Sequence, residues 1–263
     1  MKGHIMLRKV SISIFLIGAL VLAGCEGTVD GELDSEFAVN GLLLHNPNDN
    51  TSFAYAFILE DGEPIPALTS FLVTSNEDST QLVPIGGGAY LTNEGMLNIA
   101  PDSSYVFWAG EDLGDFYFSK TLDIADTFSV VVTRPATRIY SGGTVSIEWD
   151  PPSAEFGYFV TIEPPSDAAS PFWEFANSTN EFVIGAEAFT TSTGQRVTGI
   201  YKIYVVAYSE TFYSDALIEN DDRVFFPYPD TGFANNIDLV DVKGRLGSAI
   251  ISFYDSVTVI AQP

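Results

Sequence analysis

Cysteine and histidine are scarce in this chain of 263 residues, which holds one cysteine, Cys25, and two histidines, His4 and His45. A disulfide needs two cysteines, and a structural zinc site needs several cysteine or histidine ligands, so neither is expected. A Ser-His-Asp triad needs a histidine, and no Gly-x-Ser-x-Gly motif accompanies His45. We expect His45 to be a solvated turn residue, and we expect no catalytic or metal-binding residue.

Basic residues are also few, because 11 lysines and arginines stand against 35 aspartates and glutamates, a formal charge of −24. All the acidic residues follow Gly24, so the remainder of the chain has eight basic and 35 acidic side chains, a charge of −27. Such a surface repels nucleic acids and anionic lipid headgroups. We therefore expect no nucleic-acid partner.

The apolar run at the start of the chain is too short for a membrane-spanning helix, which needs about 20 apolar residues. It extends from Val10 to Leu22 and follows three basic residues. A charged start, a short apolar middle and small residues at the end predict a secretory signal peptide over residues 1–24.

The motif Leu22-Ala23-Gly24-Cys25 resembles the lipobox of bacterial lipoproteins. The resemblance implies cleavage just before Cys25 and a diacylglyceryl group on its thiol, so that the lipid anchors the chain to a membrane. Glu26 stands where an aspartate holds some lipoproteins at the inner membrane, which favours the outer membrane of a Gram-negative host. The alternative is an ordinary secretory peptide with a chance cysteine.

Beyond the cysteine, residues 25–36 are small and acidic, which predicts a lipidated, flexible tether rather than an edge strand. Residues 37–133 then contain short β-rich runs separated by turn-forming clusters about every 8–12 residues, which predicts a β-sandwich domain. Parts of this domain, including the stretch from Ala100 to Tyr105, resemble the regulatory sandwich domains of carboxypeptidases. In that family a glycine usually stands at the position of Asp102.

Residues 134–263 predict a second β-sandwich. Val145, Ile147 and Trp149 alternate with polar residues, and the runs 158–162 and 201–207 alternate in the same way. These three runs resemble strands B, C and F of fibronectin type III domains. The resemblance implies that Tyr201 is a corner tyrosine whose hydroxyl bonds to upstream backbone, and that residues 255–261 form strand G. The expected fold is therefore all-β, with two tandem sandwiches of the immunoglobulin or fibronectin type III kind.

A long insert separates the expected strands F and G, at about residues 210–250. A structureless loop of that length is improbable inside a compact domain unless it is functional. Either the insert forms an extra hairpin against the sandwich, or the strand G assignment is wrong.

Asparagines suggest one metal-site pattern, because Asn46, Asn48 and Asn50 alternate as the first ligands of an EF-hand loop do. The sixth position is Thr51 rather than glycine, and the twelfth is Phe57 rather than glutamate, so the match fails. We expect no cofactor; calcium is compatible with such oxygen-rich turns, but the spacing gives it no support.

Aromatic residues are the remaining binding candidates. Trp173, on an expected edge strand, and Phe225, Phe226 and Tyr228, in the insert, would form an exposed patch for a sugar or protein partner. The alternative, which we favour, is that the insert covers this strand and buries both.

The motif at Cys25, the strongly acidic composition and the two expected sandwiches together predict a lipid-anchored extracytoplasmic protein of the cell envelope. Such a protein would bind or scaffold without catalysis. Its partners would be the membrane, through the lipid on Cys25, and a protein or glycan. The alternatives are a carbohydrate-binding module of a surface polysaccharide system, and a glycan- or peptide-cleaving hydrolase. A hydrolase would need two carboxylates placed across a cleft, and nothing in the sequence places them there.

Overall fold

The computed structural model describes residues 36–65, 69–74, 79–92, 97–112, 115–135, 138–140, 142–150, 157–166, 169, 172–176, 180–209, 217–219, 225–227, 237 and 241–261. Within these ranges the secondary structure is β-strand, apart from one short 3-10 helix, η1 (Ala186–Phe189). No helix in this part of the chain is long and apolar enough to cross a membrane. The expectation of an all-β fold built from sandwich sheets is confirmed.

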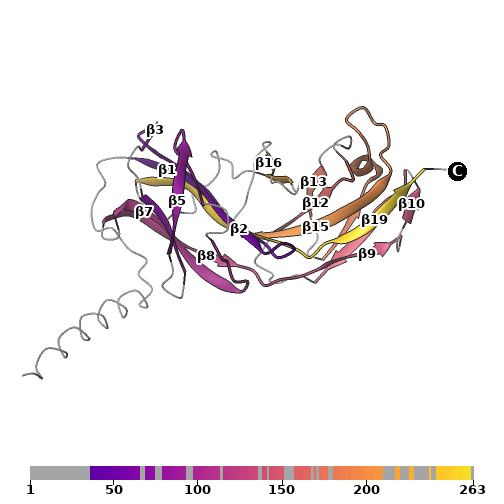
Figure 1. The fold of residues 1–263 in the computed structure, drawn as a ribbon, viewed down its shortest axis with the longest axis horizontal. Helices are drawn as coiled ribbons and strands as arrows, with labels where there is room; N and C mark the ends of the chain where they lie inside the picture. The colour runs from indigo at the N-terminus through magenta and orange to yellow at the C-terminus, as the bar shows by residue number, and fades with distance from the viewer. Residues whose placement is uncertain are drawn as a thin grey trace, which may run out of the picture.

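The first lobe contains eight strands, in the region where short β-rich runs separated by turns were expected. They are β1 (Phe37–Asn46), β2 (Thr51–Glu60), β3 (Glu63–Pro64), β4 (Thr69–Thr74), β5 (Ser79–Gly86), β6 (Ala89–Thr92), β7 (Ser103–Asp112) and β8 (Asp115–Ile124). Apart from β3, which pairs only with β2 here, they form one antiparallel run in the order β1-β2-β6-β5-β4-β7-β8. Figure 1 shows these strands in one half of an elongated molecule.

The second lobe contains β9 (Val130–Arg134), β10 (Arg138–Tyr140), β11 (Val145–Trp149), β12 (Gly157–Glu163), β13 (Phe172–Phe175), β14 (Glu181–Ile184), β15 (Gly199–Ser209) and β19 (Asp255–Ile260). Strands β9, β11 and β14 form a three-stranded sheet. In the other sheet, β15 pairs with β12 on one edge and with β19 on the other. Strand β19 lies where strand G was expected.

One long strand, β18 (Val242–Ile251), joins the two lobes. It pairs in parallel with β1 from Phe37↔Val242 to His45↔Ile250, and antiparallel with β15 from Val206↔Ile251 to Ser209↔Ser248. As a result, eleven strands from β10 to β8 follow one another in a single hydrogen-bonded sheet. The sequence did not predict β18, which lies mostly within the expected insert.

The insert also contains a small hairpin, in which β16 (Leu217–Glu219) pairs with β17 (Phe225–Pro227). Strand β17 contacts β12 and β13, and β16 lies above the middle of the molecule in Figure 1. The first of the two alternatives for the insert, an extra hairpin beside the sandwich, is therefore the one observed. The domain boundary expected between residues 133 and 134 stays a prediction, and it falls within β9, which pairs with β11.

The core follows from the alternation of each strand. On β15, Tyr201, Ile203, Val205 and Ala207 are fully buried and face the inside of the sandwich, as the alternation predicted. Trp149 is 5% exposed and packs 5.6 Å from Tyr158, measured between ring centroids. One cluster of buried apolar side chains extends from Phe37 in the first lobe to Val259 in the second. A smaller cluster, including Leu42, Phe159 and Tyr208, covers the opposite face of the joining sheet.

A candidate binding groove at the junction of the lobes

The predicted site residues lie in different parts of the molecule. Cys25 and Tyr228 lie outside the described residues. The backbone of Phe225 and Phe226 lies on β17, which contacts the strand that holds Trp173. Among the described residues β13 pairs only with β12, so Trp173 does lie on an edge strand.

The Trp173 side chain is half-buried and belongs to a run of aromatic contacts. Its ring lies 5.5 Å from that of Phe175 at 90°. Phe175 in turn contacts Phe159 and Tyr208, at 6.2 and 5.9 Å between ring centroids. Phe159 and Tyr208 belong to the smaller apolar cluster, and Phe175 packs against it. Trp173 contacts this cluster through Phe175, so packing accounts for its position without a ligand.

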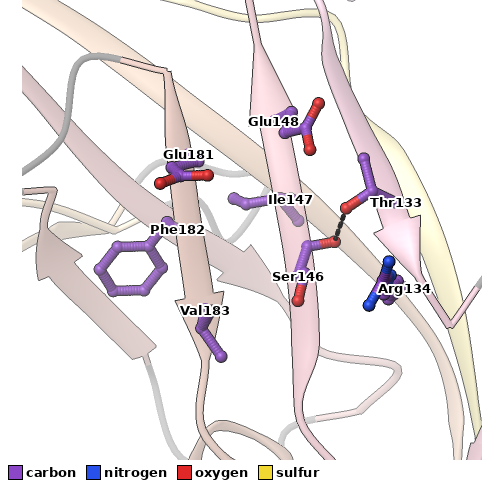
Figure 2. A pocket seen from close by; sticks show the side chains of 8 residues that line it. All are labelled: Thr133, Arg134, Ser146, Ile147, Glu148, Glu181, Phe182 and Val183. Carbon is purple, nitrogen blue, oxygen red and sulfur yellow. Dashed lines mark hydrogen bonds between the residues drawn. The ribbon is translucent and has the colours of Figure 1, made fainter.

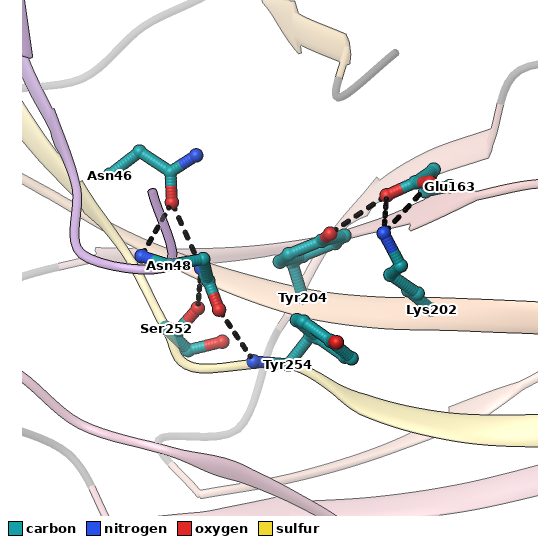
Figure 3. A network of polar contacts seen from close by, with 7 residues as sticks. All are labelled: Asn46, Asn48, Glu163, Lys202, Tyr204, Ser252 and Tyr254. Atoms are coloured by element: carbon teal, nitrogen blue, oxygen red, sulfur yellow. Dashed lines mark hydrogen bonds and ion pairs between the residues drawn. The ribbon is translucent and has the colours of Figure 1, made fainter. Parts of the chain in front are cut away.

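A different group of residues lines a groove where the lobes meet (Figure 3), with a volume of about 670 Å³. Four segments that are far apart in the chain build it: the turn between β1 and β2, the end of β12 with the following prolines, β15, and the loop between β18 and β19. The lining residues are Asn46, Asn48, Asp49, Glu163, Pro164, Pro165, Ile200, Lys202, Tyr204 and Tyr254. Junctions between structural units are a common position for ligand sites.

Glu163 is the centre of the polar contacts on one side of the groove (Figure 3). The Lys202 ammonium donates to both of its oxygens, at 3.1 and 3.0 Å, and the Tyr204 hydroxyl donates to Oε2 at 2.8 Å. The side chains of Lys202 and Glu163 remain 38% and 21% exposed. The carboxylate is thus held in place by charged and neutral donors while still reachable from solvent.

Tyr254 supplies an aromatic surface beside this carboxylate. The residue is 47% exposed, and its ring centroid lies 5.6 Å from that of Tyr204. Lys202 Nζ lies 5.1 Å from the Tyr254 ring centroid, which is within the range of a cation–π interaction. Ile200, which is 61% exposed, adds an aliphatic surface to the lining.

The opposite side of the groove is a turn held by asparagine amides. Asn48 donates from its backbone and its side chain to Asn46 Oδ1, at 3.1 and 2.9 Å. The same side chain donates to the carbonyl oxygen of Ser252 and accepts from the backbone N–H of Tyr254, at 2.9 and 3.3 Å (Figure 3). Asn46 and Asn48 thus tie the turn of one lobe to the loop that carries Tyr254 in the other.

His45 differs from the sequence expectation. It is 3% exposed, and its Nδ1 lies 2.9 Å from Ser52 Oγ, so the prediction of a solvated turn residue is wrong. The reason is that β1 continues through His45 to Asn46, which places the ring between neighbouring strands. Burial lowers the pKa of His45, against the smaller raising effects of the Thr51 backbone and the Asp49 carboxylate.

A second groove, of about 730 Å³, crosses the outer face of the three-stranded sheet. Figure 2 shows Glu148 and Glu181 at one end and Arg134 at the other, with a hydrogen bond of 3.2 Å from Thr133 Oγ1 to the Ser146 carbonyl. This groove lies at the irregular pairing of β9 with β11, where the register shifts after Ser146. A single small sheet forms this groove, and its aromatic lining residue, Phe182, is partly buried and packs against the main apolar cluster.

No model of a protein family matches the chain, and no curated protein matches it. Among solved structures, a segment of two fibronectin type III domains from chicken tenascin is 9% identical, covering 62% of this chain and 87% of that one, with a TM-score of 0.23. The fibronectin(III)-like modules of Clostridium thermocellum CbhA are 11% identical, covering 83% and 88%, with a TM-score of 0.27. The adhesin InvE of Yersinia pseudotuberculosis is 10% identical, covering 67% and 58%, with a TM-score of 0.25. At such scores these similarities add nothing about a ligand.

The groove was not predicted from the sequence. Lys202 and Tyr204 were recognisable as outward-facing residues of the alternating β15 run, but Glu163 comes from another strand and Tyr254 from the loop between β18 and β19. The sequence signal nearest to the groove is the Asn-rich turn before Thr51, because Asn46 and Asn48 line it. The spacing of these asparagines indicated only a comparison with a calcium-binding loop. No group of three or more acidic, histidine or cysteine side chains that could hold a metal occurs in the described ranges.

Proposed function

We propose that this chain is a lipid-anchored extracytoplasmic protein that binds a ligand without catalysis. The observation that carries the binding role is the groove at the junction of the lobes, because its polar side chains are fixed in place before any ligand arrives. Such preorganisation lowers the entropy cost of binding. The anchoring role rests on the motif Leu22-Ala23-Gly24-Cys25 after a charged and apolar start.

The carboxylates of the groove support binding rather than proton transfer. Both oxygens of Glu163 accept hydrogen bonds from Lys202, and Oε2 also accepts one from Tyr204. Asp49 Oδ1 accepts from the backbone and hydroxyl of Thr51, at 3.0 and 2.6 Å. A general acid or base has to exchange a proton with a substrate, whereas these groups are engaged as acceptors for neighbouring side chains.

A carbohydrate-binding module that uses Trp173 is the second candidate. The half-exposed ring of this tryptophan on an edge strand favours it. Substitution of Trp173 by alanine would then abolish glycan binding, whereas binding through the groove would survive the change.

The anchoring part is tested by fractionating host cells that produce either the wild-type chain or Cys25→Ser. The wild-type chain is expected in the membrane fraction, because a single lipid chain binds only marginally and two or three hold firmly. The Cys25→Ser chain is expected to leave that fraction. Equal membrane association of both chains, or recovery of the wild type from the cytosol, would remove the proposed anchor.

A further inference from the structure

The groove combines apolar and polar surfaces. Tyr254 and Ile200 present half-exposed apolar surface, and Pro164 and Pro165 border it. Glu163 and Lys202 place an acceptor and a donor 3.0 Å apart at the same site. A ligand that fits must therefore have an apolar face and a rim of groups that both donate and accept hydrogen bonds.

We propose that the groove binds a neutral saccharide. The C–H face of a pyranose ring would lie against Tyr254 and Ile200, and its hydroxyl groups would donate to Glu163 and accept from Lys202. Hydroxyl groups carry both donor and acceptor capacity, which matches this mixed pair. The inference rests on the proposed binding function and adds the class of ligand to it.

Charge argues against ionic ligands in this groove. An anionic ligand would approach a surface that carries a formal charge of −27 after Gly24 and would meet the carboxylates of Asp49 and Glu163. A cationic ligand would compete with Lys202, which already lies 5.1 Å from the Tyr254 ring centroid and pairs with Glu163. A neutral polyhydroxyl ligand meets neither obstacle.

The groove is held in shape by bonds between the lobes. The Tyr254 backbone N–H donates to Asn48 Oδ1, and Asn48 Nδ2 donates to the Ser252 carbonyl, so the aromatic platform cannot move away from the Asn46–Asn48 turn without breaking them. The Tyr204 hydroxyl also fixes the Glu163 carboxylate by donating to Oε2. A volume of about 670 Å³ lies within the range of small-molecule sites, which is about 300–1,000 Å³.

The test is calorimetric titration of the purified full-length mature chain in detergent with four neutral disaccharides: cellobiose, maltose, lactose and N,N′-diacetylchitobiose. At least one is expected to bind with a dissociation constant below about 10 mM, and Tyr254→Ala is expected to weaken that binding about tenfold or more. Tyr140→Ala is the matched control, because Tyr140 is an exposed tyrosine, at 56%, on a different strand. Its binding is expected to equal that of the wild type.

Two further variants separate ligand contact from loss of folding. Tyr254→Phe keeps the ring and should retain binding, while Glu163→Gln keeps the size of the side chain and should weaken binding. Failure of all four sugars to bind, or equal binding by Tyr254→Ala with its circular dichroism unchanged, would overturn the inference. Preferred binding of di-galacturonate or chitosan dimer would overturn the neutral class. None of these results alters the membrane fractionation of Cys25→Ser, so the anchoring proposal is tested separately.

Discussion

At the scale of single residues, Tyr201 shows how a sequence resemblance can fix a contact. Its hydroxyl donates to the Val197 carbonyl oxygen at 2.9 Å, its side chain is fully buried, and its ring lies 5.0 Å from that of Phe189 at 87°. This bond to upstream backbone is the one that the fibronectin type III resemblance implied, and it is confirmed. Burial raises the Tyr201 pKa to about 12.

Asp102 is a second case at this scale. It stands where the resembling sandwich family usually has glycine, and it adopts a φ of 52°, in the left-handed region that glycine favours. Aspartate tolerates this region better than most residues. Aspartate at position 102 therefore permits the same turn as the family's glycine. In this turn, which precedes β7, the Ala100 N–H donates to the Tyr105 hydroxyl at 2.5 Å.

Replacing Tyr201 by phenylalanine should lower the free energy of unfolding by about 1–2 kcal/mol, because the Val197 carbonyl loses its donor inside the fold. Urea denaturation measures the change. The control is Tyr140→Phe at an exposed position, which should alter stability by less than about 0.5 kcal/mol. A Tyr201→Phe chain as stable as the wild type would show that the bond contributes nothing.

The raised pKa of Tyr201 also predicts an alkaline limit to stability. The folded pKa of about 12 lies above the ordinary 10.0, so the folded chain keeps a proton that the unfolded chain releases between these values. Its contribution to stability is therefore complete below pH 10 and is lost as the pH rises towards 12. Denaturation curves at pH 9 to 11.5 should show this loss in the wild type and a smaller loss in Tyr201→Phe.

At the scale of elements, β18 decides how the lobes are joined, and Gly244 decides whether β18 can pair with β1. Gly244 stands opposite Val39 in the parallel ladder and has a φ of 141°. A Cβ built on this glycine would lie within 1.6 Å of the Val39 carbonyl oxygen. Only glycine therefore permits the close approach of the two strands at this point.

Gly244→Ala should lower the free energy of unfolding by at least about 3 kcal/mol, since it adds overpacking to an unfavourable backbone conformation. Gly62→Ala is the control for the backbone effect alone, because Gly62 also has a positive φ, of 85°, but nothing within 4 Å of the built Cβ. It should cost about 1–2 kcal/mol. An equal loss of unfolding free energy in the two variants would mean that β1 and β18 have room for a Cβ at residue 244, against the approach of 1.6 Å to the Val39 carbonyl oxygen.

The sequence predicted several strands in which buried and exposed residues alternate, although β10 and β14 were not predicted. Strand β11 is the clearest case, with Val145, Ile147 and Trp149 buried and the residues between them more exposed. Strand β18 escaped detection because its first half carries Lys243, Gly244 and Arg245 and its second half is buried on both faces. Its parallel partner lies about 200 residues earlier, and local alternation holds no information about so distant a pairing.

The groove could not be predicted for the same reason. Glu163, Lys202 and Tyr254 each read as ordinary strand or loop residues, and only the pairing of β12, β15 and the β18–β19 loop brings them together. The aromatic candidates were found by composition, and of these the structure describes the side chain of Trp173, which packs against Phe175. Residue type alone therefore identified an aromatic residue that packs in a cluster. The polar groove depends on which distant strands pair with one another, and local sequence does not contain that information.

At the scale of the whole molecule, the two lobes share one core and one sheet. The main apolar cluster extends from Phe37 to Val259, and β18 pairs with strands of both lobes. The Ser248 hydroxyl also donates to the Asp123 carbonyl of β8, which ties the far end of the first lobe to the same strand. Opening either lobe would expose part of the strand that completes the other.

Unfolding should therefore be a single cooperative transition. Differential scanning calorimetry should give one peak whose calorimetric and van't Hoff enthalpies agree, and fluorescence and circular dichroism should report the same midpoint. Two separated peaks would show that the lobes unfold independently, as two tandem sandwiches joined only by a linker would.

Mass spectrometry of the amino-terminal peptide, from protein extracted from the membranes of its native host, tests the proposed role most directly. If the chain is a lipid-anchored envelope protein, the peptide begins at Cys25 and carries the mass of a diacylglyceryl group. An uncleaved chain, or a peptide that contains Cys25 as a free thiol, would contradict the anchor and the extracytoplasmic role that depends on it.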